Sequence, residues 1–298
     1  MSHETKTGVL CMAYGSPSDE SEVEPYFTHI RGGRPPSAEA LEELKGRYRA
    51  IGGSPLNEIT NEQAAALSRA TGLPAFVGMK HAAPFIADGA ARAAEAGVRR
   101  LVGLPLAPHY ASMSLGAYER ELSRSWNGEL IFVRGFHDHA AFINAVAQLL
   151  REKFEERMPE RLFFTAHSLP ARIVAEGDLY FERLIESCRL VEKTLDLPPW
   201  EFAFQSASTT GEPWLGPDLL QAIERSGARD VLVCPIGFVA DHPEILYDLD
   251  VEAQAFAREK GILLRRTASF NARPEFIAAI AAVVEDSIRQ GATSHGGL

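Results

Sequence analysis

Cysteine is scarce in this sequence of 298 residues, and the three that occur, Cys11, Cys188 and Cys234, lie far apart. Because no Cys-x-x-Cys pair is present, the sequence predicts neither a disulfide framework nor a cysteine-ligated zinc site. An uninterrupted apolar run of about 18 residues is also missing, and the N-terminus lacks the basic and apolar regions of a signal peptide. We therefore expect a cytoplasmic protein with no transmembrane segment.

Positive charge is in deficit as well. Lysine and arginine number 30 against 40 aspartates and glutamates, which gives a net charge of -10. This balance argues against nucleic acid as a partner and against a broad attraction to anionic lipid. The rest of the composition, 46% hydrophobic and 23% charged, is typical of a folded globular protein. The length suffices for two ordinary domains.

Short apolar runs alternate with amphipathic segments of helical length, and four runs fall in each half of the chain. They occupy residues 8–14, 75–80, 100–108, 129–136, 161–168, 201–208, 230–238 and 262–270. Such alternation predicts an α/β fold with parallel sheets covered by helices on both faces. We expect two similar, doubly wound, Rossmann-like domains, 1–140 and 141–298, each with a four-stranded sheet and with a cleft between them. The last helix, 274–290, is able to pack back on the first domain.

Polar side chains follow six of these runs. They are Tyr14, His81, His109 with Tyr110, His167 with Ser168, Gln205 with Ser206, and His242 with Glu244. The carboxyl ends of parallel strands are where ligands bind in open α/β sheets, so these ends predict the functional site. The alternative is that polar residues simply resume where a strand ends. This alternative explains any single one of these residues better than it explains all six strand ends together.

An acidic repeat follows the seventh run. Glu244, Asp248 and Glu252 recur at every fourth position, and on an α-helix they would form one row. Like charges at this spacing repel each other. The row is therefore interpreted as a cation site or a proton path.

A basic segment, residues 16–53, lies between the first two runs and carries Arg31, Arg34, Arg47 and Arg49. Guanidinium groups bind carboxylates and phosphates bidentately, so a polycarboxylate or phosphate ligand is expected. A solvated face, paired with the acidic residues of the same segment, is the alternative. No nucleotide-binding P-loop or G-x-G-x-x-G turn is present.

His167 lies in the turn after a very apolar run and is expected to have a neutral ring nitrogen near pH 7, able to take a proton or bind a metal. Together with Glu244 it suits a transition metal that is held transiently, because two ligands are too few for a closed structural site. A hydrolase that uses Ser168 is disfavoured, because no G-x-S-x-G motif is present and adjacent residues rarely supply both nucleophile and base.

Five motifs, MAYGSP, FFTAHSLP, FQSASTTGEPWLGPDL, CPIGFVADHPEILYDLDVEA and NARPEFI, closely resemble those of the ferrochelatases, lyases of haem (porphyrin) biosynthesis that insert ferrous iron into a porphyrin. VEPYFTHIRGGRPP and LKGRYRAIGGSPL further resemble the bacterial coproporphyrin ferrochelatases, soluble enzymes that make iron coproporphyrin III. The resemblance spans essentially the whole chain and implies the two-domain chelatase fold.

The resemblance also implies roles for particular residues. His167 and Glu244 match the family's catalytic pair at the metal-insertion site, and Asp248 and Glu252 match an outer acidic row where a second divalent cation can bind. Tyr14 matches a tyrosine on the opposite face of the macrocycle. Residues that match porphyrin and propionate contacts are Arg31, Arg47, Tyr48, Ser54 and Tyr118.

The expected partners are coproporphyrin III and Fe²⁺, both as substrates, together with neighbouring enzymes of the haem pathway. We expect a monomer with no permanently bound cofactor. An iron-sulfur cluster is not expected, because no cysteine follows Cys234. The alternatives are a protoporphyrin IX ferrochelatase, a chelatase that inserts cobalt or nickel into another tetrapyrrole, and a non-catalytic porphyrin or haem carrier. A carrier would not need the acidic row.

Overall fold

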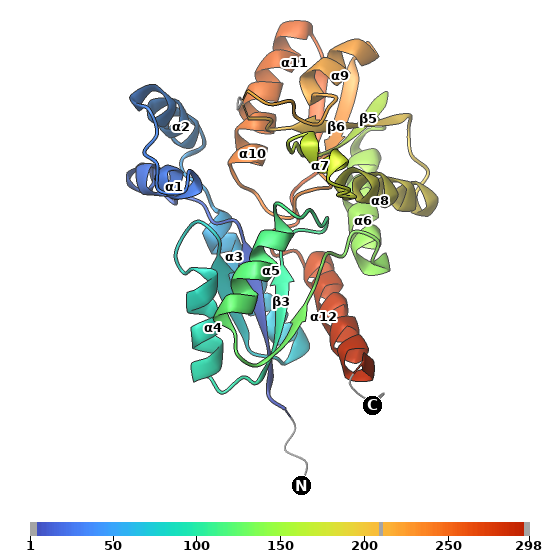
Figure 1. The fold of residues 1–298 in the computed structure, drawn as a ribbon. Helices are drawn as coiled ribbons and strands as arrows, with labels where there is room; N and C mark the ends of the chain where they lie inside the picture. The colour runs from blue at the N-terminus through green and yellow to red at the C-terminus, as the bar shows by residue number, and fades with distance from the viewer. Residues whose placement is uncertain (1–4, 209–210, 295–298) are drawn as a thin grey trace. The chain divides into compact units, whose positions relative to one another are not determined.

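The computed structural model describes residues 5–208 and 211–294, and the chain divides into two compact units (Figure 1). The first comprises Met1–Phe136 and Phe270–Leu298, and the second comprises His137–Ser269. Each unit contains a four-stranded sheet in which every neighbouring pair of strands is parallel. The predicted α/β class with two doubly wound four-stranded sheets is confirmed.

The first unit has the strand order β2-β1-β3-β4. Its strands are β1 (Thr7–Ala13), β2 (Ala75–Met79), β3 (Arg100–Pro105) and β4 (Glu129–Phe132). Its helices are the 3₁₀ turn η1 (Glu20–Glu22), α1 (Val23–Ile30), α2 (Ala38–Ile51), α3 (Leu56–Thr71), α4 (Ile86–Glu95), α5 (Leu115–Ser125) and α12 (Pro274–Ser294). Residues 9–12 of β1 are fully buried because this strand is central in the sheet and helices cover it.

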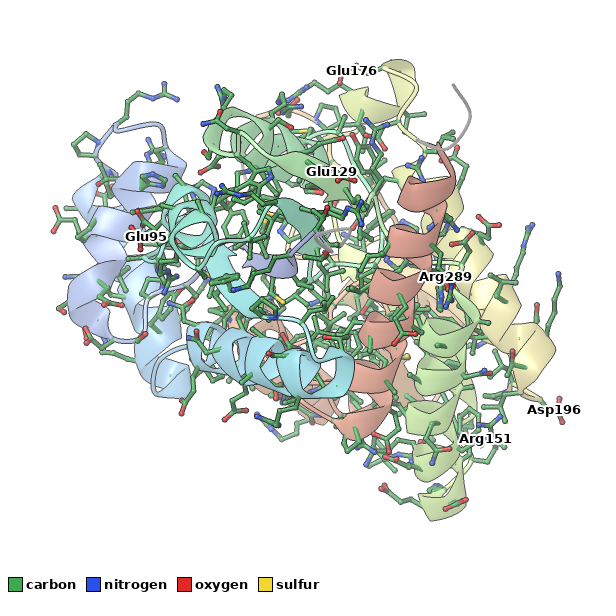
Figure 2. All side chains as sticks on the ribbon, turned by 90° about the horizontal axis from the view of Figure 1, so that it is seen from below. Glu95, Glu129, Arg151, Glu176, Asp196 and Arg289 are labelled. Carbon is green, nitrogen blue, oxygen red and sulfur yellow. The ribbon has the colours of Figure 1, made fainter. Side chains whose placement is uncertain are left out.

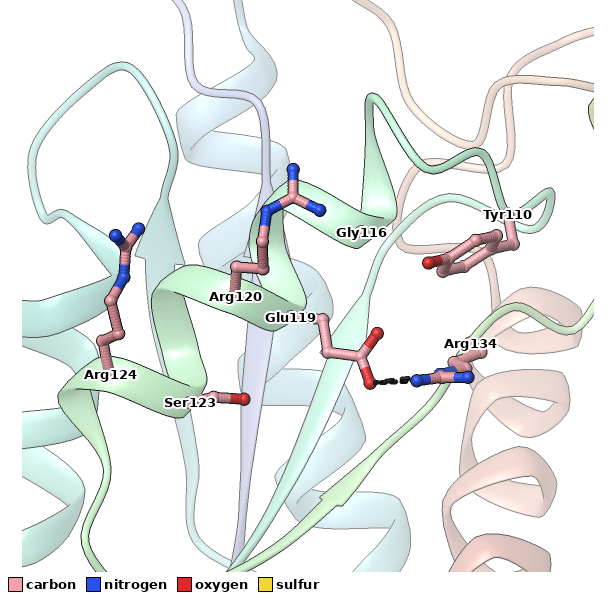
Figure 3. Close-up of a pocket in the computed structure, with 7 residues that line it drawn as sticks. All are labelled: Tyr110, Gly116, Glu119, Arg120, Ser123, Arg124 and Arg134. Atoms are coloured by element: carbon pink, nitrogen blue, oxygen red, sulfur yellow. Dashed lines mark hydrogen bonds and ion pairs between the residues drawn. The ribbon is translucent and has the colours of Figure 1, made fainter. Parts of the chain in front are cut away.

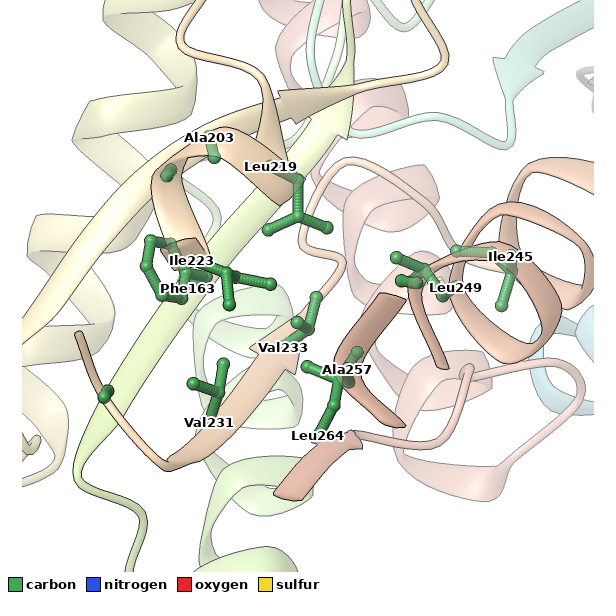
Figure 4. Close-up of a cluster of buried hydrophobic side chains, with 13 residues drawn as sticks. Phe163, Ala203, Leu219, Ile223, Val231, Val233, Ile245, Leu249, Ala257 and Leu264 are labelled. Carbon is green, nitrogen blue, oxygen red and sulfur yellow. The ribbon is translucent and has the colours of Figure 1, made fainter. Parts of the chain in front are cut away.

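The second unit has the equivalent strand order, β6-β5-β7-β8. Its strands are β5 (Arg161–His167), β6 (Trp200–Gln205), β7 (Asp230–Cys234) and β8 (Leu263–Arg266). Its helices are α6 (Ala140–Glu156), α7 (Arg172–Ala175), α8 (Tyr180–Thr194), α9 (Leu219–Ser226), α10 (Pro243–Leu246), the π-helical turn η2 (Asp248–Ala253) and α11 (Gln254–Lys260). One core cluster joins Phe163 of β5 and Val233 of β7 to Ile223 of α9 and Leu249 of η2 (Figure 4).

The strand order places a topological switch point between the first and third strand of each unit, that is, between β1 and β3 and between β5 and β7. In open parallel sheets, ligands bind at such points outside the carboxyl ends of the strands. His167 is the last residue of β5, and Tyr14 directly follows β1. The fold therefore puts both residues at the ends of strands that border a switch point.

The division of the chain falls after Phe136, and the chain re-enters the first unit at Phe270. Helix α12 packs against α3, β3 and β4 of that unit. Figure 2 shows charged side chains such as Glu95 and Asp196 projecting from the ribbon, and both are exposed. Within the described ranges, no helix combines the length and apolarity that a bilayer-spanning segment needs.

Candidate functional site

His167 is fixed from several sides at the end of β5. The hydroxyl of Tyr180 donates a hydrogen bond to its main-chain oxygen at 3.0 Å, and its ring Nδ1 pairs with the main-chain oxygen of Ser168. A carbonyl only accepts, so Nδ1 carries a proton and Nε2 is directed elsewhere. The imidazole therefore has a defined orientation before any ligand arrives.

Glu244 lies between two imidazoles. Its Oε1 is 3.3 Å from Nε2 of His167, and its Oε2 is 3.0 Å from Nε2 of His242. The other ring nitrogen of His242 donates to the main-chain oxygen of Ala240 at 2.8 Å, which orients that ring as well. The structure thus brings the two predicted catalytic residues together and adds His242, which the sequence placed at a strand end without assigning it a role.

Close backbone packing delivers the Glu244 segment to this position. Gly237, in the turn after β7, donates its main-chain N–H to the carbonyl of Thr165 at 3.0 Å. A Cβ at Gly237 would lie only 2.4 Å from the Cβ of Ala166, the residue before His167. Only glycine allows this approach, so the turn after β7 can cross the end of β5.

A buried amide links β6 to the same segment. Gln205 accepts a hydrogen bond from the hydroxyl of Thr165 at 2.8 Å and donates from Nε2 to the main-chain oxygen of Glu244 at 2.6 Å. The next residue, Ser206, has a positive φ of 62°, which is uncommon for a residue other than glycine, and its hydroxyl donates to the carboxylate of Asp248. Both residues hold the acidic segment at the strand ends.

The electrostatics of the pair differ from the expectation that His167 is neutral. Burial alone lowers the pKa of His167, but the charge and hydrogen bond of Glu244, with help from Ser168 and Asp248, raise it to about 9. Burial would raise the pKa of Glu244, but the two imidazoles hold it well below its ordinary value. Near neutral pH the pair is therefore an imidazolium and a carboxylate, since the carboxylate partner outweighs desolvation.

The acidic segment is not the regular α-helix that the four-residue spacing predicted. Helix α10 ends at Leu246, and a π-helical turn follows, in which the N–H of Glu252 donates to the main-chain oxygen of Tyr247 at 2.9 Å. A π-turn has more residues per turn than an α-helix, so positions four apart stay closer to one line. Glu244 and Asp248 are half-buried, and Glu252 at the end of the row is exposed.

Within the described ranges, His167 and Glu244 do not form part of a closed metal-binding site. Among the described residues, no group of three or more His, Cys, Asp or Glu side chains lies close enough to hold a metal ion. His167 and Glu244 can each offer one donor atom to an entering ion, with His242 and Asp248 next to them. Two protein ligands leave most coordination positions open, which suits an ion that is passed on.

In the first unit, Tyr14 is 41% exposed and is surrounded by cationic and aromatic groups. Its ring centroid lies 4.5 Å from that of His81, and the ammonium of Lys80 lies 5.7 Å from the ring centroids of both Tyr14 and Tyr118. Burial and the positive charges of Lys80 and His29 lower the pKa of His81 to about 4, so this ring is neutral. His81 was among the polar residues that marked the strand ends in the sequence, whereas Lys80, directly before it, was not predicted as a site residue.

The basic segment separates into exposed and buried groups. Arg31 ends α1 with its guanidinium 5.6 Å from the ring centroid of Phe27, and Arg47 is paired with Glu43 at 3.1 Å. Arg31 is exposed, and no carboxylate within the described ranges forms an ion pair with it. The predicted solvated pairing therefore holds for Arg47 but not for Arg31.

The other predicted porphyrin contacts are largely covered by protein. Tyr48, Ser54 and Tyr118 are only 3%, 6% and 6% exposed. The hydroxyl of Tyr48 is hydrogen bonded to the hydroxyl of Ser16 at 2.8 Å. Their side chains therefore contribute to packing, and of the predicted contacts in this unit the exposed groups are Tyr14 and Arg31, with Arg47 half-buried.

Comparison with solved structures defines the class of fold. SirB from Bacillus subtilis with Fe³⁺ matches with a TM-score of 0.61 at 11% identity, covering 98% of each chain. CbiX, described as the terminal enzyme for biosynthesis of siroheme in denitrifying bacteria, matches with a TM-score of 0.57 at 13% identity over 95% of this chain and 98% of CbiX. At such low identity the likeness shows the fold alone, which is that of the chelatases.

Sequence comparison identifies the family. Residues 6–288 match the profile of the Ferrochelatase family. The ferrochelatase of Thermus thermophilus is 40% identical over 93% of this chain and 98% of the relative. The coproporphyrin III ferrochelatases of Geobacillus sp. and Halalkalibacterium halodurans are 38% and 39% identical over 95% and 96% of this chain and 98% of each relative. The chain belongs to the ferrochelatase family, and the resemblance seen in its motifs is confirmed.

Proposed function

We propose that this chain inserts Fe²⁺ into coproporphyrin III and releases iron coproporphyrin III. The observation that carries the proposal is the Glu244 carboxylate held between His167 and His242 at the carboxyl end of β5, beside a switch point. Three of the relatives that match nearly the whole chain bear the name coproporphyrin III ferrochelatase, which supports the choice of porphyrin.

The charge balance of the reaction sets what the site must do. A dication enters the macrocycle and two pyrrole protons leave it, so the site needs a base and a route for protons. His167 is protonated near neutral pH and cannot act as the base in that state. An approaching dication disfavours the imidazolium by repulsion, and the proton of His167 then passes to Glu244 or to solvent.

Once neutral, the Nε2 of His167 is free to accept a pyrrole proton or to bind the metal. The carboxylates of Glu244 and Asp248, which are half-buried, and of Glu252, which is exposed, then conduct charge toward solvent. The same row is the candidate second divalent-cation site, at Asp248 and Glu252.

Propionate binding supplies the energy to bend the macrocycle. A planar porphyrin hides its nitrogen lone pairs, so remote contacts must favour a distorted ring. The exposed guanidinium of Arg31 and the half-buried one of Arg47 are the candidate partners for the propionates. Tyr14, exposed at the end of β1, is the candidate ligand on the other face of the macrocycle.

We also propose that the enzyme is a monomer, that it has no resident cofactor and that it exchanges its porphyrin with neighbouring enzymes of haem biosynthesis. We propose that the reaction takes place in the cytoplasm. The three cysteines are free and buried, as in proteins of a reducing compartment, which supports this location.

Protoporphyrin IX is the second candidate substrate, because relatives from Herpetosiphon aurantiacus and Thermus thermophilus carry the name ferrochelatase without a porphyrin. The test is the anaerobic steady-state rate of Fe²⁺ insertion with each porphyrin at equal concentration. We expect kcat/KM for coproporphyrin III to be higher by about tenfold or more, because two additional propionates can form charge-assisted hydrogen bonds. A preference for protoporphyrin IX would overturn the choice of substrate, and stoichiometric binding without metalation would indicate a carrier.

A further inference from the structure

A second candidate site lies in the first unit, in a cavity beside helix α5 (Figure 3). Its volume is about 470 Å³, and we call it the α5 pocket. It is lined by Tyr110, Gly116, Glu119, Arg120, Ser123, Arg124 and Arg134. None of these residues belongs to the His167 and Glu244 site or to the predicted porphyrin contacts. The volume falls in the range of sites for small molecules.

The lining has an excess of positive charge in a chain whose net charge is -10. The lining contains three guanidiniums and one carboxylate, and that carboxylate already has a partner. Oε1 of Glu119 accepts hydrogen bonds from Nε and Nη2 of Arg134 at 3.1 and 2.9 Å. Glu119 and Arg134 therefore neutralise each other, and two positive charges remain, on Arg120 and Arg124.

These two arginines lie one turn apart on α5, and Figure 3 shows their side chains extending in the same direction. Throughout the described ranges, no carboxylate forms an ion pair with either of them. Burial raises the pKa of Glu121 on the same helix, while the charges of Lys80 and, to a lesser extent, Arg124 lower it. Like charges four residues apart destabilise a helix, and a bound anion would relieve that repulsion.

Gly116 is the one lining residue without a side chain. A Cβ at this position would lie 2.9 Å from the hydroxyl oxygen of Tyr110 and 3.4 Å from Nη1 of Arg120. Because Gly116 has no side chain, the hydroxyl of Tyr110 and the guanidinium of Arg120 can approach each other at the first turn of α5. Ser123 adds a second hydroxyl to the lining. The groups that surround the space are mainly hydrogen-bond donors, as an oxyanion requires.

We propose that the α5 pocket binds a small polyanion that carries at least two phosphate or carboxylate groups. Arg120 and Arg124 each bind one oxyanion group bidentately, and the hydroxyls of Tyr110 and Ser123 complete the donor set. The pocket is open to solvent, and its volume is in the range of sites for a small molecule. The negative net charge of the chain disfavours a nucleic acid. This proposal does not rest on the proposed function, because it uses other residues and its test needs neither iron nor porphyrin.

Isothermal titration calorimetry of the full chain with pyrophosphate, and separately with citrate, tests the proposal in metal-free buffer at low salt. We expect saturable binding of at least one probe, weakened by added salt. The double variant R120A/R124A should weaken binding by about tenfold or more. The control is R225A/R258A, which removes two exposed arginines of the second unit and should bind like wild type.

Two further variants sharpen the result. E119Q releases Arg134 from its carboxylate and should tighten binding severalfold, and G116A should weaken it, because a methyl group enters the space that Tyr110 and Arg120 share. Thermal unfolding checks that each variant is folded. Binding of only one probe supports the proposal and tells phosphate from carboxylate. Affinities weaker than about 1 mM for both probes, or equal binding by R120A/R124A and the control, would overturn it.

Discussion

The carboxylate of Glu244 lies 3.3 Å from Nε2 of His167, so the end of β5 and the start of α10 meet in one ion pair. The pair determines the protonation of the site. Burial lowers the pKa of His167 and raises that of Glu244, but the Glu244 charge outweighs burial at His167, and the two imidazoles of His167 and His242 outweigh it at Glu244, so both groups stay charged. A resting imidazolium cannot take a pyrrole proton, so the arrival of the metal dication must precede proton transfer in the proposed reaction.

Replacing Glu244 by Gln should lower the pKa of His167 from about 9 toward or below its ordinary value of about 6.5. The substitution removes the charge that raises this pKa, and burial then dominates. NMR titration of the His167 ring in the absence of metal measures the change. E252Q is the matched control, because Glu252 is exposed and is not among the causes of the shift. A pKa that remains near 9 in E244Q would contradict the ion-pair account.

The same pair predicts a pH dependence of stability. The folded-state pKa of His167 is raised above its unfolded value of about 6.5, so its stabilisation is fully present below pH about 6.5 and is lost as the pH rises through about 9. Both side chains are about one third exposed, so solvent screening limits the contribution to about 1–2 kcal/mol. Urea unfolding should show wild type more stable than E244Q at pH 6. The difference should shrink at pH 10, and a constant difference would exclude the linkage.

Gln205 should act as a positioning residue for Glu244. Truncation to Ala leaves the main-chain oxygen of Glu244 without this donor and the hydroxyl of Thr165 without its acceptor, at a cost of about 1–3 kcal/mol of stability. We expect kcat for iron insertion to fall by about tenfold while KM for the porphyrin stays near wild type, because Glu244 loses its support. Q221A is the control, since Gln221 is exposed. If the Q205A variant lost stability but kept the wild-type kcat, Gln205 would have only a structural role and would not position Glu244 for catalysis.

Arg31 should contribute to catalysis through propionate binding. If its binding energy bends the macrocycle, R31A lowers kcat as well as raising KM, and kcat/KM falls by about tenfold or more. R49A is the matched control, because Arg49 is paired with Glu20 and Glu42 and is not available to a ligand in the same way. Steady-state kinetics of both variants measure the effect. A higher KM with unchanged kcat would mean that this contact binds ground state and transition state equally.

Much of the fold was predictable because it depends on local patterns. The central strands β1 and β5 are buried on both faces, so they are near-continuous apolar runs; Tyr14 follows β1, and His167 ends β5. The π-turn at Asp248–Ala253 was not predictable, since its sequence fits the period of an α-helix and only the packing of the segment selects the wider turn. The sequence did anticipate that the last helix packs back on the first domain, and in the structure α12 packs against α3 of that unit.

The proximity of His167 and Glu244 was predictable from the sequence, but the protonation state of the pair was not. The position of His167 and Glu244 after buried strands was a usable signal. The raised pKa of His167 follows from a distance that no sequence pattern encodes. The burial of Tyr48 likewise reflects a hydrogen bond to Ser16, 32 positions away in the sequence.

The most direct test of the central claim is a comparison of wild type with H167A in multiple-turnover insertion of Fe²⁺ into coproporphyrin III, followed anaerobically by the absorbance of the metalated product. Wild type should metalate many equivalents of porphyrin per enzyme, while folded H167A should bind the porphyrin and metalate it no faster than the uncatalysed reaction. Turnover by H167A at the wild-type rate would contradict the account.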